Sequence, residues 1–548
     1  MREEDTVSAK RSIGLILAAA ALYFLAFPPF PTGFLACLFL VPFFAVLEGN
    51  GFGRGFRLGT ALGFLSIGGL LYWLSFNKGS SAAQSIAMHV STAAYLAFAW
   101  GAFGLCLAFV GRRFGRIGLW AAPFLWTAME YVQSMGSLGF TWHSLATTQT
   151  RYTPVLQIIS ATGMFGLSFW AVLVNVLVYR ALFACRGGGE GRDRRGALRF
   201  AIIAAAVAFL PVALGLAAIP GAGDPGCDAI RAALVQPNTD SNRKFPERNL
   251  AYLALMKLTM SLRGGDHDVI VWPETATAFV VREQEDRLRE IREVVARTGA
   301  SLITGMSDRR AVSGAKPKRS GDDEERSRAE TIKGSASRKV NAVGLIRPGS
   351  LELQTYEKLH LVPFGEYVPP FLGFLEDMAM NVGSGIYVAG TEVRLFDVPL
   401  REGGGARTVK IAAVICLESN YPALVNRFVE RGARALVVVA NDDWYAGTTQ
   451  AVQHAEIAKL RAVEHRIPVL RCSNAGVSSI IDAGGRVLAA SEEEVQAIVT
   501  ARVPLGPGPS FYSRHGDWFP TGALALSLAF LAFVGIVRIR DRRASGRR

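Results

Sequence analysis

Long apolar runs, each able to cross a bilayer as a helix, occupy most of the first 219 residues. A bilayer core about 30 Å thick requires roughly 20 apolar residues in helical form. Seven such runs precede residue 220 and an eighth lies near the C-terminus, near 12–28, 33–48, 57–76, 87–110, 117–134, 155–183, 198–219 and 518–537. Their number and length predict an α-helical polytopic membrane domain with about eight spans.

Between residues 220 and 517 the pattern changes to short apolar runs that alternate with amphipathic segments. The predicted strands are 229–235, 268–272, 300–305, 340–346, 410–415, 435–440, 468–472 and 477–482, and the predicted helices are 246–262, 283–298 and 449–465. Near-continuous apolar strands alternating with helices indicate an α/β domain whose sheets are covered by helices. Residues 309–339 are charged, rich in Ser and Gly and free of aromatic side chains, so we expect a mobile insertion there.

The positive charge lies where cytoplasmic loops are expected. The chain has 548 residues, a net charge of +14 and only 19% charged residues. Its arginines cluster between the apolar runs, near 112–116, 192–199 and 538–543. Because basic loops stay in the cytoplasm, this pattern places the N-terminus inside and residues 220–517 outside. We therefore predict three parts: a membrane domain at 1–219, an extracytoplasmic domain at 220–517, and a final helix with a basic cytoplasmic tail at 518–548.

The charge and cysteine patterns exclude several other classes of protein. Because much of the arginine lies in short clusters between the apolar runs, the positive charge does not predict nucleic-acid binding. The six cysteines show neither a CxxC spacing nor a paired framework, and the seven histidines are scattered. We expect no metal and no organic cofactor.

Three polar residues in the α/β region suggest chemistry. Glu274 follows the apolar run 269–273, Cys416 follows 411–415, and Lys358 lies in a stretch dense in Pro, Gly and aromatic residues, YEKLHLVPFGEYVP. Each has a simpler interpretation: an inert core thiol, a carboxylate at a helix start and a solvated lysine. Together they could form a nucleophile, a base and an oxyanion partner.

These motifs resemble the nitrilase (carbon–nitrogen hydrolase) superfamily. The resemblance rests on Trp272-Pro273-Glu274, on Lys358 and on Cys416-Leu417-Glu418. HLVPFGEYVP, together with seven preceding spans and one following span, resembles the apolipoprotein N-acyltransferases specifically. Two positions depart from that family's pattern: Leu417 stands where Tyr is common, and Phe245 stands where Trp is common.

The resemblance implies an αββα sandwich and a reaction. Cys416 would accept an acyl chain from a phospholipid, the sn-1 chain of phosphatidylethanolamine by analogy, with Glu274 as base and Lys358 as oxyanion partner. A diacylated apolipoprotein would then take the acyl chain on its N-terminal amine. Residues expected to support the site or bind substrate are Glu366, Glu418, Leu417 through its backbone N–H, Phe245, Tyr367 and Trp444, with Phe371 and Phe374 as further candidates for the acyl-chain channel.

Two other functions remain open at this point. A membrane-tethered nitrilase or amidase would resolve the same thioester with water, although a tether needs one span rather than eight. A transporter or scaffold would carry a catalytically inactive outer domain. We expect a monomer in the bacterial inner membrane. In the membrane domain, Glu130 is a functional or structural candidate, and Trp142 and His143 are expected at the membrane interface.

Overall fold

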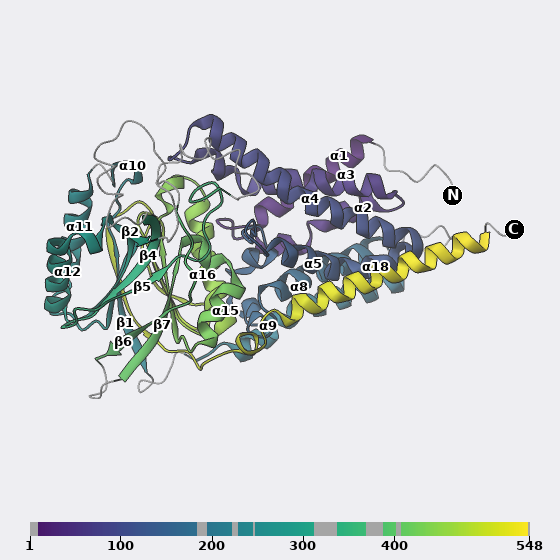
Figure 1. The fold of residues 1–548 in the computed structure, drawn as a ribbon. Coiled ribbons are helices and arrows are strands. Elements are labelled where there is room, and N and C mark those ends of the chain that lie inside the picture. Colours follow the sequence, from purple (N-terminus) through teal and green to yellow (C-terminus); the bar gives the residue numbers. More distant parts are fainter. Residues whose placement is uncertain are drawn as a thin grey trace.

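The protein has a bundle of membrane helices at one end and a two-sheet domain at the other (Figure 1). The computed structural model describes residues 9–183, 194–221, 228–244, 247–311, 337–368, 387–401 and 407–545. Both described ends of the chain lie at the far end of the bundle from the sheets (Figure 1).

The bundle contains five described helical segments that are long and apolar enough to cross a membrane: Ala9–Ala26, Ala82–Gln133, Met164–Phe183, Arg194–Ala218 and Trp518–Asp541. The predicted count of eight spans is therefore not confirmed. The helices of the bundle are α1 (Ala9–Ala26), α2 (Leu40–Leu47), α3 (Phe52–Leu70), α4 (Ala82–Phe114), α5 (Ala122–Gln133), α8 (Met164–Phe183), α9 (Arg194–Ala218) and α18 (Trp518–Ser545).

The predicted runs and the observed helices differ for local reasons. The run 33–48 is divided into a 3-10 turn, Gly33–Cys37, and the short helix α2. The run 155–183 is broken at Gly163, whose positive φ of 67° ends the short helix α7 (Ile159–Thr162) before α8 begins. Helix α5 turns back along α4, since the Gln133 side chain donates to the carbonyl of Leu96.

The α/β part contains two six-stranded sheets. The first has the order β12-β1-β2-β3-β4-β5, and the second has the order β11-β10-β9-β8-β7-β6. Parallel pairs form the centre of each, β1-β2-β3 in the first and β7-β8-β9 in the second. The strands are β1 (Ala229–Gln236), β2 (Val269–Val280), β3 (Ser301–Ala311), β4 (Ser337–Ile346), β5 (Leu353–Glu357), β6 (Leu395–Leu400), β7 (Arg407–Ile415), β8 (Ala435–Ala440), β9 (Val469–Ser473), β10 (Ser479–Ile481), β11 (Val487–Ala490) and β12 (Ala497–Pro504).

The two sheets pack face to face, with helices on both outer faces. Helices α11 (Arg248–Met260) and α12 (Glu285–Thr298) cover the first sheet, and α15 (Pro422–Glu430) and α16 (Gln450–His465) lie between the second sheet and the membrane helices (Figure 1). An apolar cluster fills the space between the first sheet and its helices, and includes Tyr252, Trp272 and Ile291. A second cluster joins α16 to the membrane part through Leu156, Phe165 and Leu460.

Several strands continue beyond their predicted ends. β2 extends through Glu274 to Val280, because its pairing with β3 resumes after an irregularity between Trp272 and Thr277. β3 and β4 pair as far as Ala311 and Ser337, so both ends of the predicted insertion 309–339 belong to strands. Residues 312–336 lie outside the described residues. The strands β5, β6, β11 and β12 and the helix α15 are not in the sequence prediction, because their apolar runs are short or mixed with charged residues.

Candidate active site

Glu274 lies in a kink of β2. The pairing of β2 with β3 passes from Trp272 opposite Thr304 to Thr277 opposite Met306, and Thr275 has a positive φ of 49°. The neighbouring strand approaches closely here, since a Cβ added at Gly305 would lie 2.6 Å from Cα of Glu274. The kink places the mostly buried carboxylate beside β4, where the Asn341 amide donates to Glu274 Oε1 at 2.8 Å.

Lys358 is held at the end of β5 by its backbone and by two carboxylates. Its N–H donates to the carbonyl of Asn341 at 2.8 Å. Its ammonium lies 2.9 Å from Glu366 and 3.8 Å from Glu274. The Asn341 amide also donates to Glu366 Oε1 at 2.9 Å and so joins the two carboxylates. The Lys358 side chain is only 1% exposed, so its charge depends on these partners.

Cys416 occupies a strained turn at the end of β7. Its φ is 52°, in the left-handed region that a residue with a Cβ rarely adopts. The strand ends at Ile415, and a 3-10 turn, Cys416–Asn420, follows at once. Backbone strain of this kind persists where the surrounding structure enforces it, often at functional sites. The turn leaves Cys416 partly buried at the carboxyl end of a parallel strand.

The electrostatics of the three residues are linked. Burial lowers the pKa of Lys358, but Glu366, Glu274 and Cys416 outweigh it and raise that pKa above its ordinary value. Burial and Glu274 raise the pKa of the Cys416 thiol, and Lys358 partly opposes them. Lys358 is therefore a permanent cation, and the resting thiol is protonated and needs a base to become a nucleophile. Burial and Lys358 lower the pKa of the adjacent His360 to about 4, so that ring is neutral near pH 7.

Glu418 is fully buried two residues after Cys416. Its Oε1 accepts hydrogen bonds from the Tyr356 hydroxyl at 2.8 Å and from the N–H groups of Leu359 and His360 at 2.7 and 3.0 Å. Its Oε2 accepts from the N–H of Ile415 at 2.9 Å. This carboxylate therefore joins the loop of Lys358 to the turn of Cys416.

The other predicted residues lie around this centre. The Tyr367 hydroxyl donates to the carbonyl of Ser137, in the loop of the membrane part that follows α5. The carbonyl of Trp444 accepts from the N–H of Lys78 at 2.9 Å, and a Cβ added at Gly79 would lie 2.9 Å from the Trp444 ring. The side chain of Leu417 is buried. Phe245, Phe371 and Phe374 lie outside the described residues.

The loop that follows α5 reaches the turn of Cys416. Thr141 donates to the carbonyl of Asn420 at 2.7 Å, and the Tyr421 hydroxyl donates to the carbonyl of Gly139 at 2.7 Å. Trp142 and His143 are buried at this junction, where the Trp142 indole donates to Gln453 on α16. The loop therefore fixes the catalytic domain to the bundle.

Glu130, on α5, holds the end of the same loop. Its carboxylate accepts hydrogen bonds from the side chains of Trp126, Ser144 and Ser168 and from the N–H of Leu145, at distances of 2.6 to 3.1 Å. A buried carboxylate with four donors has a sufficient structural reason to be there.

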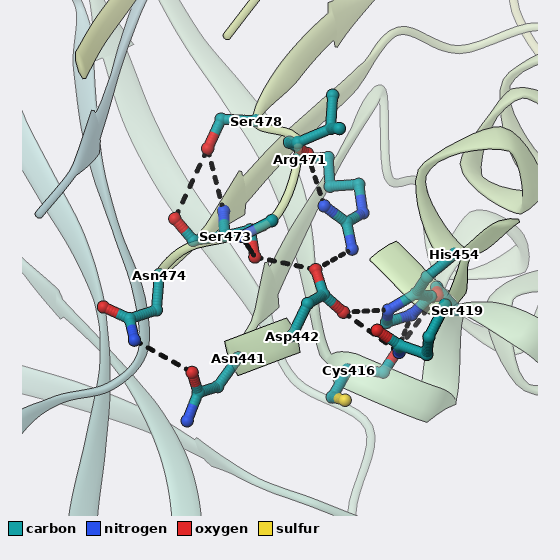
Figure 2. A network of polar contacts seen from close by, with 12 residues as sticks. Cys416, Ser419, Asn441, Asp442, His454, Arg471, Ser473, Asn474 and Ser478 are labelled. Carbon is teal, nitrogen blue, oxygen red and sulfur yellow. Dashed lines mark hydrogen bonds and ion pairs between the residues drawn. The ribbon is translucent and has the colours of Figure 1, made fainter. Parts of the chain in front are cut away.

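The sequence prediction of the site omits Asn341, and it omits the contacts that join a second group of residues. Asn341 was detectable only as a polar residue within the apolar strand 340–346. The other group is a buried network behind Cys416, made by Asp442, His454, Arg471 and Ser473 (Figure 2). Asp442 follows the predicted strand 435–440, and Arg471 and Ser473 lie at the end of the predicted strand 468–472, but the sequence does not show that these residues meet His454 on a helix. Among the described residues, no three His, Cys, Asp or Glu side chains are grouped so that they could hold a metal ion.

Comparison with known proteins agrees with this architecture. The family model described as the apolipoprotein N-acyltransferase N-terminal domain matches residues 19–177, and the carbon-nitrogen hydrolase model matches residues 231–507. The apolipoprotein N-acyltransferase of Allorhizobium ampelinum is 30% identical over 567 aligned positions, which cover 95% of this chain and 96% of that one. This chain belongs to the apolipoprotein N-acyltransferase family.

Other members of the apolipoprotein N-acyltransferase family match over most of their length. The Chlorobaculum tepidum protein is 32% identical over 435 positions, or 78% of each chain. The Geobacter metallireducens protein is 28% identical over 493 positions, or 88% of this chain and 87% of that one. Family membership and the long apolar helices together make this a multi-pass membrane protein with a nitrilase-like domain.

Proposed function

We propose that this protein transfers an acyl chain from a phospholipid to the N-terminal amine of a diacylated apolipoprotein, through a thioester on Cys416. The observation that carries the proposal is the position of the Lys358 ammonium, 2.9 Å from Glu366 and 3.8 Å from Glu274, where its charge also acts on the Cys416 thiol. Membership of the acyltransferase family and the attachment of this site to apolar helices point to lipid substrates.

In the first half-reaction, Glu274 takes the proton of the Cys416 thiol, and the thiolate attacks the ester carbonyl of the phospholipid. The Lys358 ammonium and the backbone N–H of Leu417 stabilise the oxyanion of the tetrahedral intermediate. The intermediate collapses with cleavage of the bond to the glycerol oxygen. Glu274 then returns its proton to that oxygen, which releases a lysophospholipid and leaves an acyl-thioester.

In the second half-reaction, the α-amine of the diacylglyceryl-cysteine attacks the thioester carbonyl. The same two donors stabilise the new oxyanion, and Glu274 takes a proton from the attacking nitrogen. The carbon–sulfur bond breaks, an amide forms, and Glu274 returns the proton to the sulfur of Cys416. Lys358 stays charged through both halves because Glu366, the carboxylate that raises its pKa most, takes no part in the proton transfers.

The supporting residues have positioning roles in this scheme. Glu366 and Asn341 hold the Lys358 ammonium and the Glu274 carboxylate close to each other. Glu418 fixes the loop of Lys358 relative to the turn of Cys416. Tyr367 and Trp444 attach the site to the outer loops of the membrane part. We propose that these contacts set the height of the site above the lipid surface, with Tyr367 near the acyl chain.

The distribution of arginines supports an extracytoplasmic catalytic domain. Arg112 and Arg113 end α4. Arg538 lies near the end of α18 and stacks on Phe52 and Phe109. Helix α18 runs away from the sheets toward this end of the bundle (Figure 1). Because arginine-rich ends stay in the cytoplasm, the sheets would face the periplasmic side of the inner membrane.

The experiment that tests the proposal is intact-mass spectrometry of the purified protein with phosphatidylethanolamine and no acceptor. The wild type should gain one acyl chain, the Cys416→Ala variant should gain none, and a diacylated lipopeptide should remove the chain from the wild type. An adduct that water removes at the same rate with or without lipopeptide would indicate a tethered hydrolase. No adduct with any phospholipid would refute the acyl-transfer proposal.

A further inference from the structure

His454 lies on α16, directly behind the turn of Cys416, and is almost fully buried. Its Nδ1 is 2.8 Å from Asp442 Oδ1, and its Nε2 is 3.3 Å from the carbonyl oxygen of Cys416 (Figure 2). Among the described contacts, neither ring nitrogen bonds the sulfur of Cys416. His454 therefore touches the nucleophile through its backbone and is not placed to act as its base.

The carboxylate of Asp442 fixes one proton on this ring. Asp442 Oδ2 accepts from Arg471 Nη2 at 2.6 Å and from the Ser473 hydroxyl at 2.7 Å. Burial raises the pKa of Asp442, but Arg471 and His454 outweigh it and hold that pKa well below its usual range. An ionised carboxylate can only accept hydrogen bonds, so Nδ1 of His454 carries a proton.

The other ring nitrogen of His454, Nε2, also faces hydrogen-bond acceptors. Besides the carbonyl of Cys416, Nε2 lies 3.4 Å from the hydroxyl oxygen of Ser419. That hydroxyl lies 2.9 Å from the same Cys416 carbonyl and 3.3 Å from the amide oxygen of Asn420, so its single proton is directed to an oxygen rather than to Nε2. A proton on Nε2 satisfies this arrangement, and the carbonyl of Cys416 then accepts from both His454 and Ser419.

This carbonyl belongs to the peptide unit whose nitrogen is that of Leu417. Donors on a peptide oxygen polarise the unit and strengthen its N–H as a donor. No acceptor in the described part of the chain bonds the N–H of Leu417, which leaves it free for a substrate oxyanion.

We propose that His454 is a positioning residue that holds the Cys416–Leu417 peptide and strengthens the Leu417 N–H as an oxyanion donor. The inference rests on the proposed acyl transfer, since it assigns a role within that reaction. Asp442 and Arg471 orient the ring, and the buried network of Figure 2 continues into β9 through Ser473. The function of this network is then to orient the His454 ring toward the carbonyl of Cys416.

The test compares two rates at Cys416 in the full-length protein. Acylation by phosphatidylethanolamine passes through an oxyanion, whereas alkylation by iodoacetamide does not. His454→Asn keeps a polar group near Asp442 but does not reach the Cys416 carbonyl, so acylation should fall about tenfold, less than for loss of an oxyanion donor itself. Alkylation, located by peptide mass, should stay within about twofold of wild type, because no oxyanion is involved.

Two further variants test whether the effect comes from the hydrogen bond to the Cys416 carbonyl or from the loss of any buried histidine of α16. His454→Gln places an amide near the position of Nε2 and should recover most of the acylation rate. His465→Asn changes a second buried histidine of α16, which bonds Ser513 instead, and should leave acylation within about threefold of wild type. If His454→Asn does not fold, Ser419→Ala removes the other donor on the same carbonyl and should slow acylation without slowing alkylation.

Three results would overturn the inference: wild-type acylation in His454→Asn, a parallel fall of acylation and alkylation, or equal rates for the Asn and Gln variants. An absence of acyl adduct on the wild type is a different outcome, because it would refute the proposed function itself.

Discussion

Glu418 accepts the backbone N–H of Leu359 across 2.7 Å, and this bond joins two loops whose side chains must work together. Leu359 follows Lys358, and Glu418 lies two residues after Cys416. The other oxygen of Glu418 accepts the N–H of Ile415, immediately before the nucleophile. One carboxylate therefore fixes Lys358, the proposed oxyanion partner, relative to Cys416, the proposed nucleophile, through backbone contacts alone.

Replacing Glu418 should destabilise the protein and reduce transfer together. Glu418→Ala leaves four donors without an acceptor, and each of the two buried ones, on Tyr356 and Ile415, costs about 1–3 kcal/mol. Glu418→Gln keeps one oxygen for three of them and should be the milder change. Thermal unfolding in detergent should give the order wild type, Gln, Ala from most to least stable. An Ala variant that unfolds at the wild-type temperature would contradict the role of Glu418 as a clamp.

Removal of the Lys358 ammonium should nearly abolish transfer. Loss of one oxyanion donor usually costs about two or more decades of rate, so Lys358→Ala should retain less than about a hundredth of wild-type activity. The measurement is the rate of lipopeptide N-acylation, with folding checked by thermal unfolding. Lys459→Ala, which breaks only an ion pair with Glu456 on α16, is the matched control and should stay near wild type. More than about a tenth of wild-type activity in Lys358→Ala would contradict an oxyanion role.

Removing the charge of Glu274 and removing that of Lys358 should shift the pH dependence of Cys416 alkylation in opposite directions. Burial and Glu274 raise the pKa of the thiol, so at a given pH less thiolate forms than for a free cysteine. Glu274→Gln removes a negative charge and should move the alkylation profile to lower pH, although transfer is lost. Lys358→Met removes the opposing positive charge and should move it to higher pH. Glu430→Gln, at the exposed end of α15, should leave the profile unchanged. A reversed order would show that these charges do not act on the sulfur.

The sequence predicts the site well where a polar residue ends an apolar strand. Cys416 follows an apolar run that becomes β7, because a buried parallel strand needs such a run and its carboxyl end faces the site. Glu274 is a different case, since the strand continues through it after a kink. That kink depends on the close approach of Gly305 in the next strand, and no local pattern encodes such a contact.

The sequence did not predict the contacts between distant segments either, because no local pattern encodes them. Asn341 bridges Glu274 and Glu366 from another strand, and His454 reaches Cys416 from a helix. A single polar residue in an apolar strand or a single histidine on a helix has many possible partners. Tertiary packing selects one of them, and the chain alone gives neither the distance nor the direction.

The packing of α3 against α4 gives a prediction for the membrane part. Gly55, Gly59 and Gly63 form a stripe on α3 that lets the helix backbones approach closely, as small residues do between membrane helices. A Cβ at Gly59 would lie 2.3 Å from the carbonyl oxygen of Trp100, whereas a Cβ at Gly53, on the same helix, would meet nothing within 4 Å.

Gly59→Ala should therefore destabilise the protein by about 1–3 kcal/mol, the usual cost of overpacking. Gly53→Ala should be neutral or slightly stabilising, since Ala favours a helix by up to about 1 kcal/mol over Gly. Because both variants make the same chemical change on one helix, the difference between their unfolding temperatures isolates the close contact. Equal unfolding temperatures would mean that α3 and α4 can separate at Trp100 without cost, and the stripe would then not hold the two helices together.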